Sequence, residues 1–180
     1  EEESVEALTA AKHEGLCTMV DLTTIDLGRD INLIRRVSEK TGLNIIAATG
    51  NHLAVPRPFA EASPDEIAPL YVRELEHGIE GTSIRAGIIK VASDRGGVTE
   101  AQEIILRAAA RAQAVTGAPI STHTWSPGRV GLQQITILRS EGVDLNRVYI
   151  GHSNDDRDLE YLHELLESGV WVGLDRYPGG

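Results

Sequence analysis

The sequence predicts an α/β fold in which one helix is followed by six parallel strands with helices between them. Six glycines each stand between a helical pattern and an apolar run, at intervals of 25 to 39 residues. This spacing is close to the roughly 30 residues of a strand–helix–strand unit, and glycine commonly closes the last turn of a helix. The runs after the glycines are mostly continuous rather than alternating, which is typical of parallel strands covered on both faces.

The elements follow from these signals in chain order. Capping boxes at Ser63–Glu66 and Thr99–Gln102 predict the starts of two helices, and leucines at helical spacing after residue 158 predict the last one. No linker or composition shift divides the chain, so residues 1–180 are predicted to form a single domain. The predicted strands are the runs 18–24, 44–50, 86–93, 119–125, 148–153 and 171–176.

Two architectures match this element order, a doubly wound open sheet and part of an eight-stranded barrel. The glycine-rich phosphate loop of dinucleotide-binding sheets is absent after the first strand, where Thr23-Thr24-Ile25-Asp26 stands instead. A complete barrel takes about 250 residues, whereas this chain of 180 residues supplies six strands. We therefore expect an incomplete (β/α)8 TIM barrel.

Composition limits the classes of partner. The formal net charge is −10, which argues against a nucleic-acid partner, and no apolar run is long enough for a membrane span. The single cysteine, Cys17, cannot form an internal disulfide, which fits a cytoplasmic location. Cys17 begins a predicted strand, so we expect it to be a buried apolar side chain.

Chemistry-bearing residues gather where the predicted strands end. Lys90 lies within an apolar run, His123 and His152 end the next two runs, and Asp175 and Arg176 end the last. Because the carboxyl ends of parallel strands meet at one edge, these side chains should lie close together. Two imidazoles from adjacent strands suit Zn²⁺ and similar ions, and a buried lysine must be paired, chemically modified or shifted in pKa. His52, after the second run, is a candidate for lining the same opening.

Several segments resemble a known family, the phosphotriesterase family of the amidohydrolase superfamily. The resemblance runs along the whole chain, in order and at consistent spacing, and is strongest to the phosphotriesterase-like lactonase branch. The segments are Val20-Asp21-Leu22-Thr23-Thr24, Asp26-Leu27-Gly28-Arg29-Asp30, Ala47-Ala48-Thr49-Gly50, Arg85-Ala86-Gly87-Ile88-Ile89-Lys90, Thr122-His123-Thr124, Ile150-Gly151-His152-Ser153 and Gly173-Leu174-Asp175-Arg176-Tyr177.

This resemblance implies a (β/α)8 barrel enzyme with two divalent metal ions, Zn²⁺ foremost and Co, Mn or Fe as alternatives. It implies that Lys90 carries a CO₂-derived carbamate that bridges the metals, and that His123 and His152 are metal ligands. Asp155 resembles an outer carboxylate of the proton relay. Arg176 occupies a position where lactonases carry arginine and phosphotriesterases histidine, which favours a small-molecule lactone or ester substrate, with organophosphate hydrolysis as a side activity, by a metal-bridging hydroxide.

The sequence also departs from the family pattern. It lacks the His-x-His pair of barrel strand one and the aspartate of strand eight, and Asn51-His52 replaces an aromatic residue. We therefore expect the chain to cover strands 2–7, to show little or no catalysis as a fragment, and to form a homodimer only as part of the complete enzyme. Two alternatives stay open: an imine-forming lysine enzyme of the aldolase kind using Lys90, and a non-catalytic barrel fragment.

Overall fold

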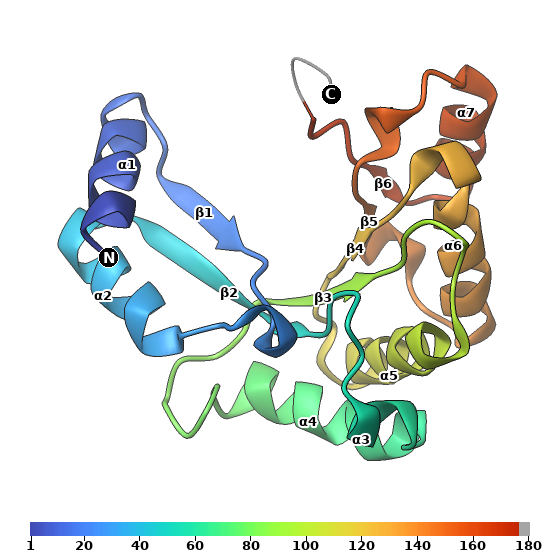
Figure 1. The fold of residues 1–180 in the computed structure, drawn as a ribbon, viewed down its shortest axis with the longest axis horizontal. Coiled ribbons are helices and arrows are strands. Elements are labelled where there is room, and N and C mark those ends of the chain that lie inside the picture. Colours follow the sequence, from blue (N-terminus) through green and yellow to red (C-terminus); the bar gives the residue numbers. More distant parts are fainter. Residues whose placement is uncertain (177–180) are drawn as a thin grey trace.

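The computed structural model describes residues 1–176 as one helix followed by six strands, with helices between successive strands (Figure 1). The predicted element order is confirmed, and the addition is α3, a single turn ahead of α4. Among the described residues, none of the helices is long and apolar enough to cross a membrane. The strands are β1 (Thr18–Asp21), β2 (Asn44–Gly50), β3 (Ile88–Ala92), β4 (Ile120–His123), β5 (Val148–Ile150) and β6 (Trp171–Val172). The helices are α1 (Glu2–His13), α2 (Ile31–Thr41), α3 (Arg57–Ala60), α4 (Pro64–Glu76), α5 (Glu100–Thr116), α6 (Val130–Ser140) and α7 (Leu159–Glu167).

The six strands form one parallel sheet in the order β1 to β6, each strand pairing with the next. The sheet curls into a half-barrel whose helices lie on its outer side (Figure 1). A strictly sequential order has no point where the strand order reverses, so the doubly wound alternative is excluded for the described residues. The expected incomplete TIM barrel is confirmed. One row of paired residues crosses five strands: Gly50, Lys90, Ser121, Tyr149 and Trp171.

Helix ends follow the sequence signals. Ser63 and Thr99 both form capping boxes with the residue three positions on, so α4 and α5 begin where predicted. Gly42 and Gly117 cap α2 and α5 with φ of 65° and 69°, a left-handed conformation that glycine adopts without strain. These turns return the chain to the sheet, so each strand starts at the same end of the half-barrel.

The core lies between the sheet and the outer helices. Ile89 and Val91 of β3 are fully buried and belong to the same apolar cluster as Leu106 and Ala109 of α5. Lys90 alternates with them and therefore faces the inner side of the sheet. The sequence thus separates a helix-facing apolar layer from an inner face that carries polar groups.

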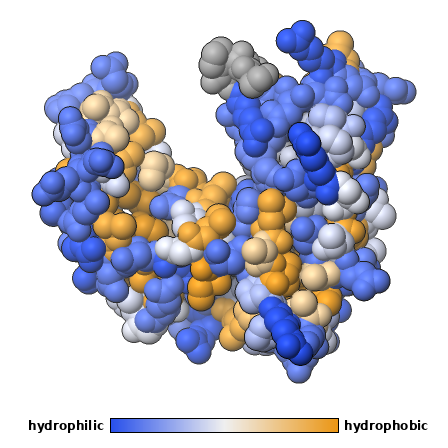
Figure 2. Space-filling view, viewed as in Figure 1, coloured by the Kyte–Doolittle hydropathy of each residue, from blue (hydrophilic) through white to orange (hydrophobic). Residues whose placement is uncertain are grey.

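The inner face is open at both arms of the half-barrel, and Figure 2 shows a deep hollow between them. Val20 and Ile46, which pair across β1 and β2, are exposed on this face, and Trp171 is 67% exposed. The expectation of strands covered on both faces therefore holds for β3 but not for β1, where exposed and half-buried residues alternate. Cys17, predicted to be buried, is exposed, because it precedes this uncovered edge strand.

A buried ion-pair cluster ties the β1–α2 connection to α4. The Arg29 side chain is 1% exposed and donates hydrogen bonds of 2.8 and 2.7 Å to the two carboxylate oxygens of Glu74. It also donates to the Ala48 carbonyl at 2.8 Å and to Glu80 at 3.1 Å. This network fixes the loop that begins beside the carboxyl end of β1.

Candidate functional site

Most of the predicted site residues lie at the carboxyl ends of the strands, whereas Lys90 lies in the middle of β3. Lys90 is 5% exposed and sits between buried Ile89 and Val91. Burial lowers the pKa of Lys90 to about 8, although the Asp175 carboxylate acts in the opposite direction. The structure therefore places an amine on the inner face of the half-barrel, and the pKa of this amine is close to neutral pH.

His123 and His152 come together from adjacent strands, as predicted. His123 ends β4 and His152 follows β5, and their ring centroids are 4.7 Å apart at an angle of 70°. His123 Nε2 is buried without a hydrogen-bond partner, with Asp94 Oδ2 3.7 Å away. Burial and then the neighbouring charges, first that of His152, lower the pKa of His123 to about 4. The His123 ring is thus neutral and has a free nitrogen available to a ligand.

Asp175 holds His152 in place. Its Oδ1 atom lies 3.0 Å from His152 Nδ1, and the carboxylate also accepts a hydrogen bond from the His152 backbone N–H. Tyr149 donates a second hydrogen bond, of 2.8 Å, to Asp175 Oδ2. Although burial opposes the shift, the bonds from Tyr149 and His152 lower the pKa of Asp175. A charged Asp175 keeps the proton of His152 on Nδ1, which leaves Nε2 with a lone pair.

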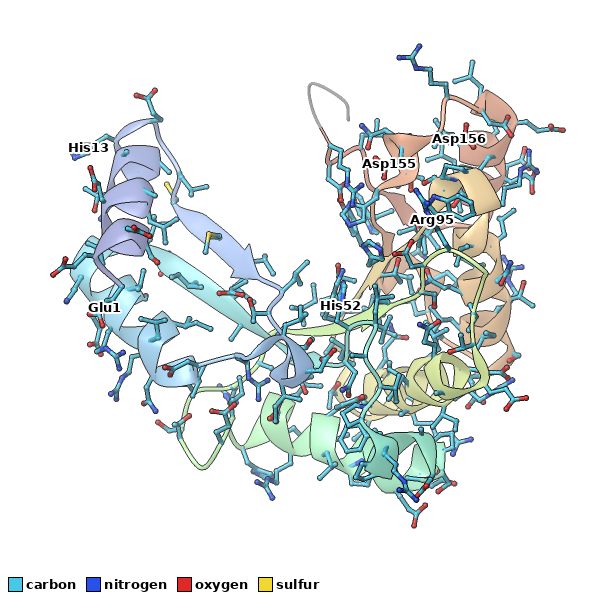
Figure 3. All side chains as sticks on the ribbon, viewed as in Figure 1. Glu1, His13, His52, Arg95, Asp155 and Asp156 are labelled. Carbon is cyan, nitrogen blue, oxygen red and sulfur yellow. The ribbon has the colours of Figure 1, made fainter. Side chains whose placement is uncertain are left out.

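His52, two residues past the end of β2, lies next to His123. Its ring centroid is 5.2 Å from that of His123, and Figure 3 shows its side chain at the floor of the hollow. The Asp26 carboxylate accepts the His52 backbone N–H at 3.0 and 3.1 Å, and buried Asn51 accepts a 2.7 Å hydrogen bond from Tyr71. Burial and then the charge of Lys90 lower the pKa of His52. The position of His52 therefore supports its predicted role in lining the opening.

Arg176 and Asp155 form a pair at the rim of the site. Arg176 Nη1 lies 2.6 Å from Asp155 Oδ2, and the Arg176 carbonyl accepts a hydrogen bond from Asn154. Both side chains are accessible, Arg176 more so than Asp155. Tyr177, the last residue of the motif Gly173-Leu174-Asp175-Arg176-Tyr177, lies outside the described residues.

Two carboxylates at the site were not predicted from the sequence. Asp94 approaches His123 from the loop after β3, and Asp26 anchors His52 from the loop after β1. Asp94 carried a usable signal, since it directly follows the predicted run 86–93, which contains Lys90. Asp26 did not, because its contact depends on how its loop folds over the end of β2.

The residues present fit a metal site in part. A buried imidazole nitrogen without a partner and a second imidazole held by a carboxylate are the donor set of a histidine metal centre. Among residues 1–176, however, no three His, Cys, Asp or Glu side chains meet in an arrangement that could hold an ion. The described chain therefore offers His123, His152 and Lys90, and no fuller set of the usual ligands.

A family model described as the phosphotriesterase family matches residues 3–179. The chain belongs to the phosphotriesterase family. This finding confirms the resemblance seen in the strand-end motifs, and the residues that the structure brings together are those that carry the family motifs. The half-barrel formed by residues 1–176 therefore agrees with the family assignment.

Curated relatives of the phosphotriesterase family match nearly the whole chain. A phosphotriesterase homology protein of Mycobacterium tuberculosis is 45% identical over 183 residues, covering 97% of this chain and 56% of the relative. An aryldialkylphosphatase of Saccharolobus solfataricus is 39% identical over 176 residues, with the same two coverages. The N-acetyltaurine hydrolase of Homo sapiens is 32% identical over 167 residues, covering 90% of this chain and 46% of the relative. The chain thus spans about half the length of these relatives.

Proposed function

We propose that this protein is a metal-dependent hydrolase of a lactone or another small-molecule ester, with organophosphate hydrolysis as a side activity. The observation that carries the proposal is the meeting of the His123 and His152 rings, with His123 Nε2 buried and unpartnered and with Lys90 buried on the neighbouring strand β3. Two relatives carry hydrolase names, an aryldialkylphosphatase and an N-acetyltaurine hydrolase, which supports the same reaction class.

In this proposal two divalent metal ions are bound, as is general in the phosphotriesterase family. His123 and His152 each supply a ring nitrogen, and Zn²⁺ suits such ligands best, with Co, Mn or Fe as alternatives. Lys90, once carboxylated, supplies oxygen ligands. When bound, the metal ions polarise the carbonyl or phosphoryl oxygen of the substrate and lower the pKa of a water molecule.

Carboxylation of Lys90 fits its surroundings. The neutral amine nitrogen bonds to the carbon of CO₂ and releases one proton, so the amine becomes a carbamate whose single negative charge is shared by two oxygens. Lys90 is 5% exposed and flanked by buried Ile89 and Val91, so the modification also removes an unpaired buried cation. The lowered pKa of Lys90, caused by burial, favours the neutral amine that this reaction needs.

The remaining side chains position these groups and the substrate. Asp175 fixes the ring of His152 through Nδ1, and Asp94 lies beside His123 Nε2. Arg176, braced by Asp155 at the rim, is placed to orient a lactone or ester at the open end of the half-barrel. We propose that Asp155 serves as an outer carboxylate that carries protons away from the site.

The activity of the whole protein is part of the proposal, because the chain spans about half the length of its relatives. We propose that the 180 residues alone turn over little substrate, since they offer a partial ligand set. We further propose that the complete enzyme is a cytoplasmic homodimer.

A second candidate is an imine-forming enzyme, favoured by the buried, readily deprotonated amine of Lys90. An imine mechanism gives no role to the unpartnered nitrogen of His123. Borohydride treatment in the presence of a carbonyl substrate separates the two, since it traps a covalent adduct on Lys90 only in the imine case.

The proposed function is tested by comparing the 180-residue chain with a version extended at both ends by the corresponding segments of the 45%-identical relative. We expect the extended protein to hydrolyse a lactone and paraoxon, to lose activity to a chelator and to regain it with Zn²⁺ or Co²⁺. We expect a metal content near two per extended chain and one or less for the 180 residues. Family-like turnover by the 180-residue chain, or chelator-resistant turnover by the extended protein, would contradict the proposal.

A further inference from the structure

Arg95 and Trp125 form a cation–π pair on the loops that follow β3 and β4. Arg95 Cζ lies over the Trp125 ring, 5.4 Å from its centroid. The ring also packs closely against Gly128, where an added Cβ would come within 2.6 Å of a ring carbon. The tryptophan is therefore held by its own loop and offers a fixed surface to the guanidinium.

Both members of this pair flank His123. Trp125 follows His123 by two residues, and Asp94, the neighbour of Arg95, places Oδ2 3.7 Å from His123 Nε2. The other oxygen of Asp94 accepts the Arg95 backbone N–H at 2.8 Å, which fixes the start of the loop. In Figure 3 Arg95 lies on the same arm of the half-barrel as Asp155, with His52 below at the floor of the hollow.

The charge of Arg95 is not used within the described chain. Arg95 is exposed, and among residues 1–176 no carboxylate oxygen lies within ion-pair distance of its guanidinium. Arg176, the other arginine at this end, is instead paired with Asp155. The chain has a net charge of −10, so acidic side chains that could pair with an arginine are abundant. Because Arg95 is held in position but pairs with none of them, we infer that its guanidinium is available to a ligand from outside the described chain.

The position of the ring limits which ligand fits. Trp125 occupies the side of the guanidinium that faces its ring, while the N–H donors of an arginine point outward in its own plane. Two parallel N–H groups at that edge match the two oxygens of a carboxylate, and such charge-assisted pairs are stronger than neutral hydrogen bonds.

We propose that Arg95 binds a carboxylate carried by the substrate, away from the bond that is hydrolysed, and that Trp125 holds the guanidinium in position. The inference rests on the proposed function, because it places the reacting bond near His123. It narrows the substrate class to esters or lactones with an anionic tail.

Binding to the 180-residue chain tests the inference without turnover. The chain has two tryptophans, Trp125 and Trp171, so a Trp171→Phe background leaves only the Trp125 fluorescence. We expect glutarate to change this signal saturably and the neutral analogue glutaramide to have no effect. Arg95→Gln should weaken glutarate binding about tenfold or more, whereas Arg139→Gln, an exposed arginine on the last turn of α6, should leave it unchanged. The absence of saturable binding, or equal binding by the Arg95→Gln variant, would overturn the inference.

Turnover by the extended protein separates this inference from the proposed function. We expect kcat/KM for mono-4-nitrophenyl glutarate to exceed that for 4-nitrophenyl butyrate by about tenfold or more, and Arg95→Gln to abolish most of this ratio. Glutarate binding without any ester hydrolysis would contradict the proposed function alone. Hydrolysis of both esters with a ratio that Arg95→Gln does not change would contradict the Arg95 assignment alone.

Discussion

Asp175 Oδ1 lies 3.0 Å from the Nδ1 atom of His152 and 3.0 Å from its backbone nitrogen. One carboxylate therefore fixes both the ring and the main chain of a residue whose φ is +59°. A non-glycine residue in this left-handed conformation needs such support. The contact with Nδ1 also selects the tautomer that leaves Nε2 free for a metal ion.

Substitution Asp175→Asn tests this relationship. The amide cannot stabilise the protonated Nδ1 as a carboxylate does, so the His152 ring loses orientation and basicity. We expect Zn²⁺ affinity to fall by about 10- to 100-fold, measured by competition with a chromogenic chelator. Asp156→Asn is the matched control, since Asp156 accepts a hydrogen bond from Asp158 rather than from His152. Equal affinity of the Asp175→Asn variant and the unmodified chain would show that His152 is positioned by other contacts.

Substitution Lys90→Met tests carboxylation. In ¹³C-labelled bicarbonate with Zn²⁺ present, we expect the protein with Lys90 in place to show a carbamate resonance by ¹³C NMR and the variant to lack it. Methionine fills similar space without a charge, so the thermal midpoint should stay the same or rise. Lys12→Met is the control, because Lys12 bonds the Thr41 carbonyl on the outer side of the half-barrel. A carbamate signal that persists in the Lys90→Met variant, or is missing from the protein with Lys90 in place, would contradict the assignment.

Much of the fold could be predicted from the sequence, because local signals agree with the global architecture. Glycines at fixed φ and capping boxes mark the helices, and the bounds of β2 are the same in prediction and structure. Most other strands are shorter than predicted. The predicted run 148–153 ends at Ile150, since His152 leaves the strand geometry to meet Asp175. The predicted strand ends therefore differ from the observed ones where contacts within the site replace the pairing between strands.

The core of the candidate site could also be predicted, because strand ends in a parallel sheet meet at one edge. This rule brings His123 and His152 together without knowledge of any loop, and the alternation of side chains along β3 places Lys90 on the inner face. The contacts of Asp26 with His52 and of Arg95 with Trp125 depend on loop conformation, which hydrophobic patterns do not encode. The exposure of Cys17 depends on what covers the edge strand, which is likewise not a local property.

Substitution Arg29→Gln should destabilise the protein strongly. It removes the partner of the Glu74 carboxylate and leaves the Ala48 carbonyl unsatisfied in a region where the arginine side chain is 1% exposed. We expect a loss of about 3–5 kcal/mol in the free energy of unfolding, measured by urea denaturation. Arg57→Gln breaks the ion pair with Glu61, but Arg57 is 87% exposed, so its loss should stay within about 1 kcal/mol. Similar losses for both variants would show that burial does not set the strength of the Arg29 cluster.

Substitution Arg176→His should shift substrate preference in the extended protein. The 2.6 Å pair with Asp155 holds the arginine at the rim, and a shorter imidazole would open that rim and release the carboxylate. By resemblance to the family, lactonases carry arginine and phosphotriesterases histidine at this position. We expect the ratio of paraoxon to lactone turnover, taken as kcat/KM, to rise about tenfold or more. Arg157→His changes an exposed arginine in the neighbouring loop and should leave the ratio unaltered. If the two variants give the same ratio, Arg176 does not determine specificity, and the proposed preference for lactones has to be assigned to other residues of the site.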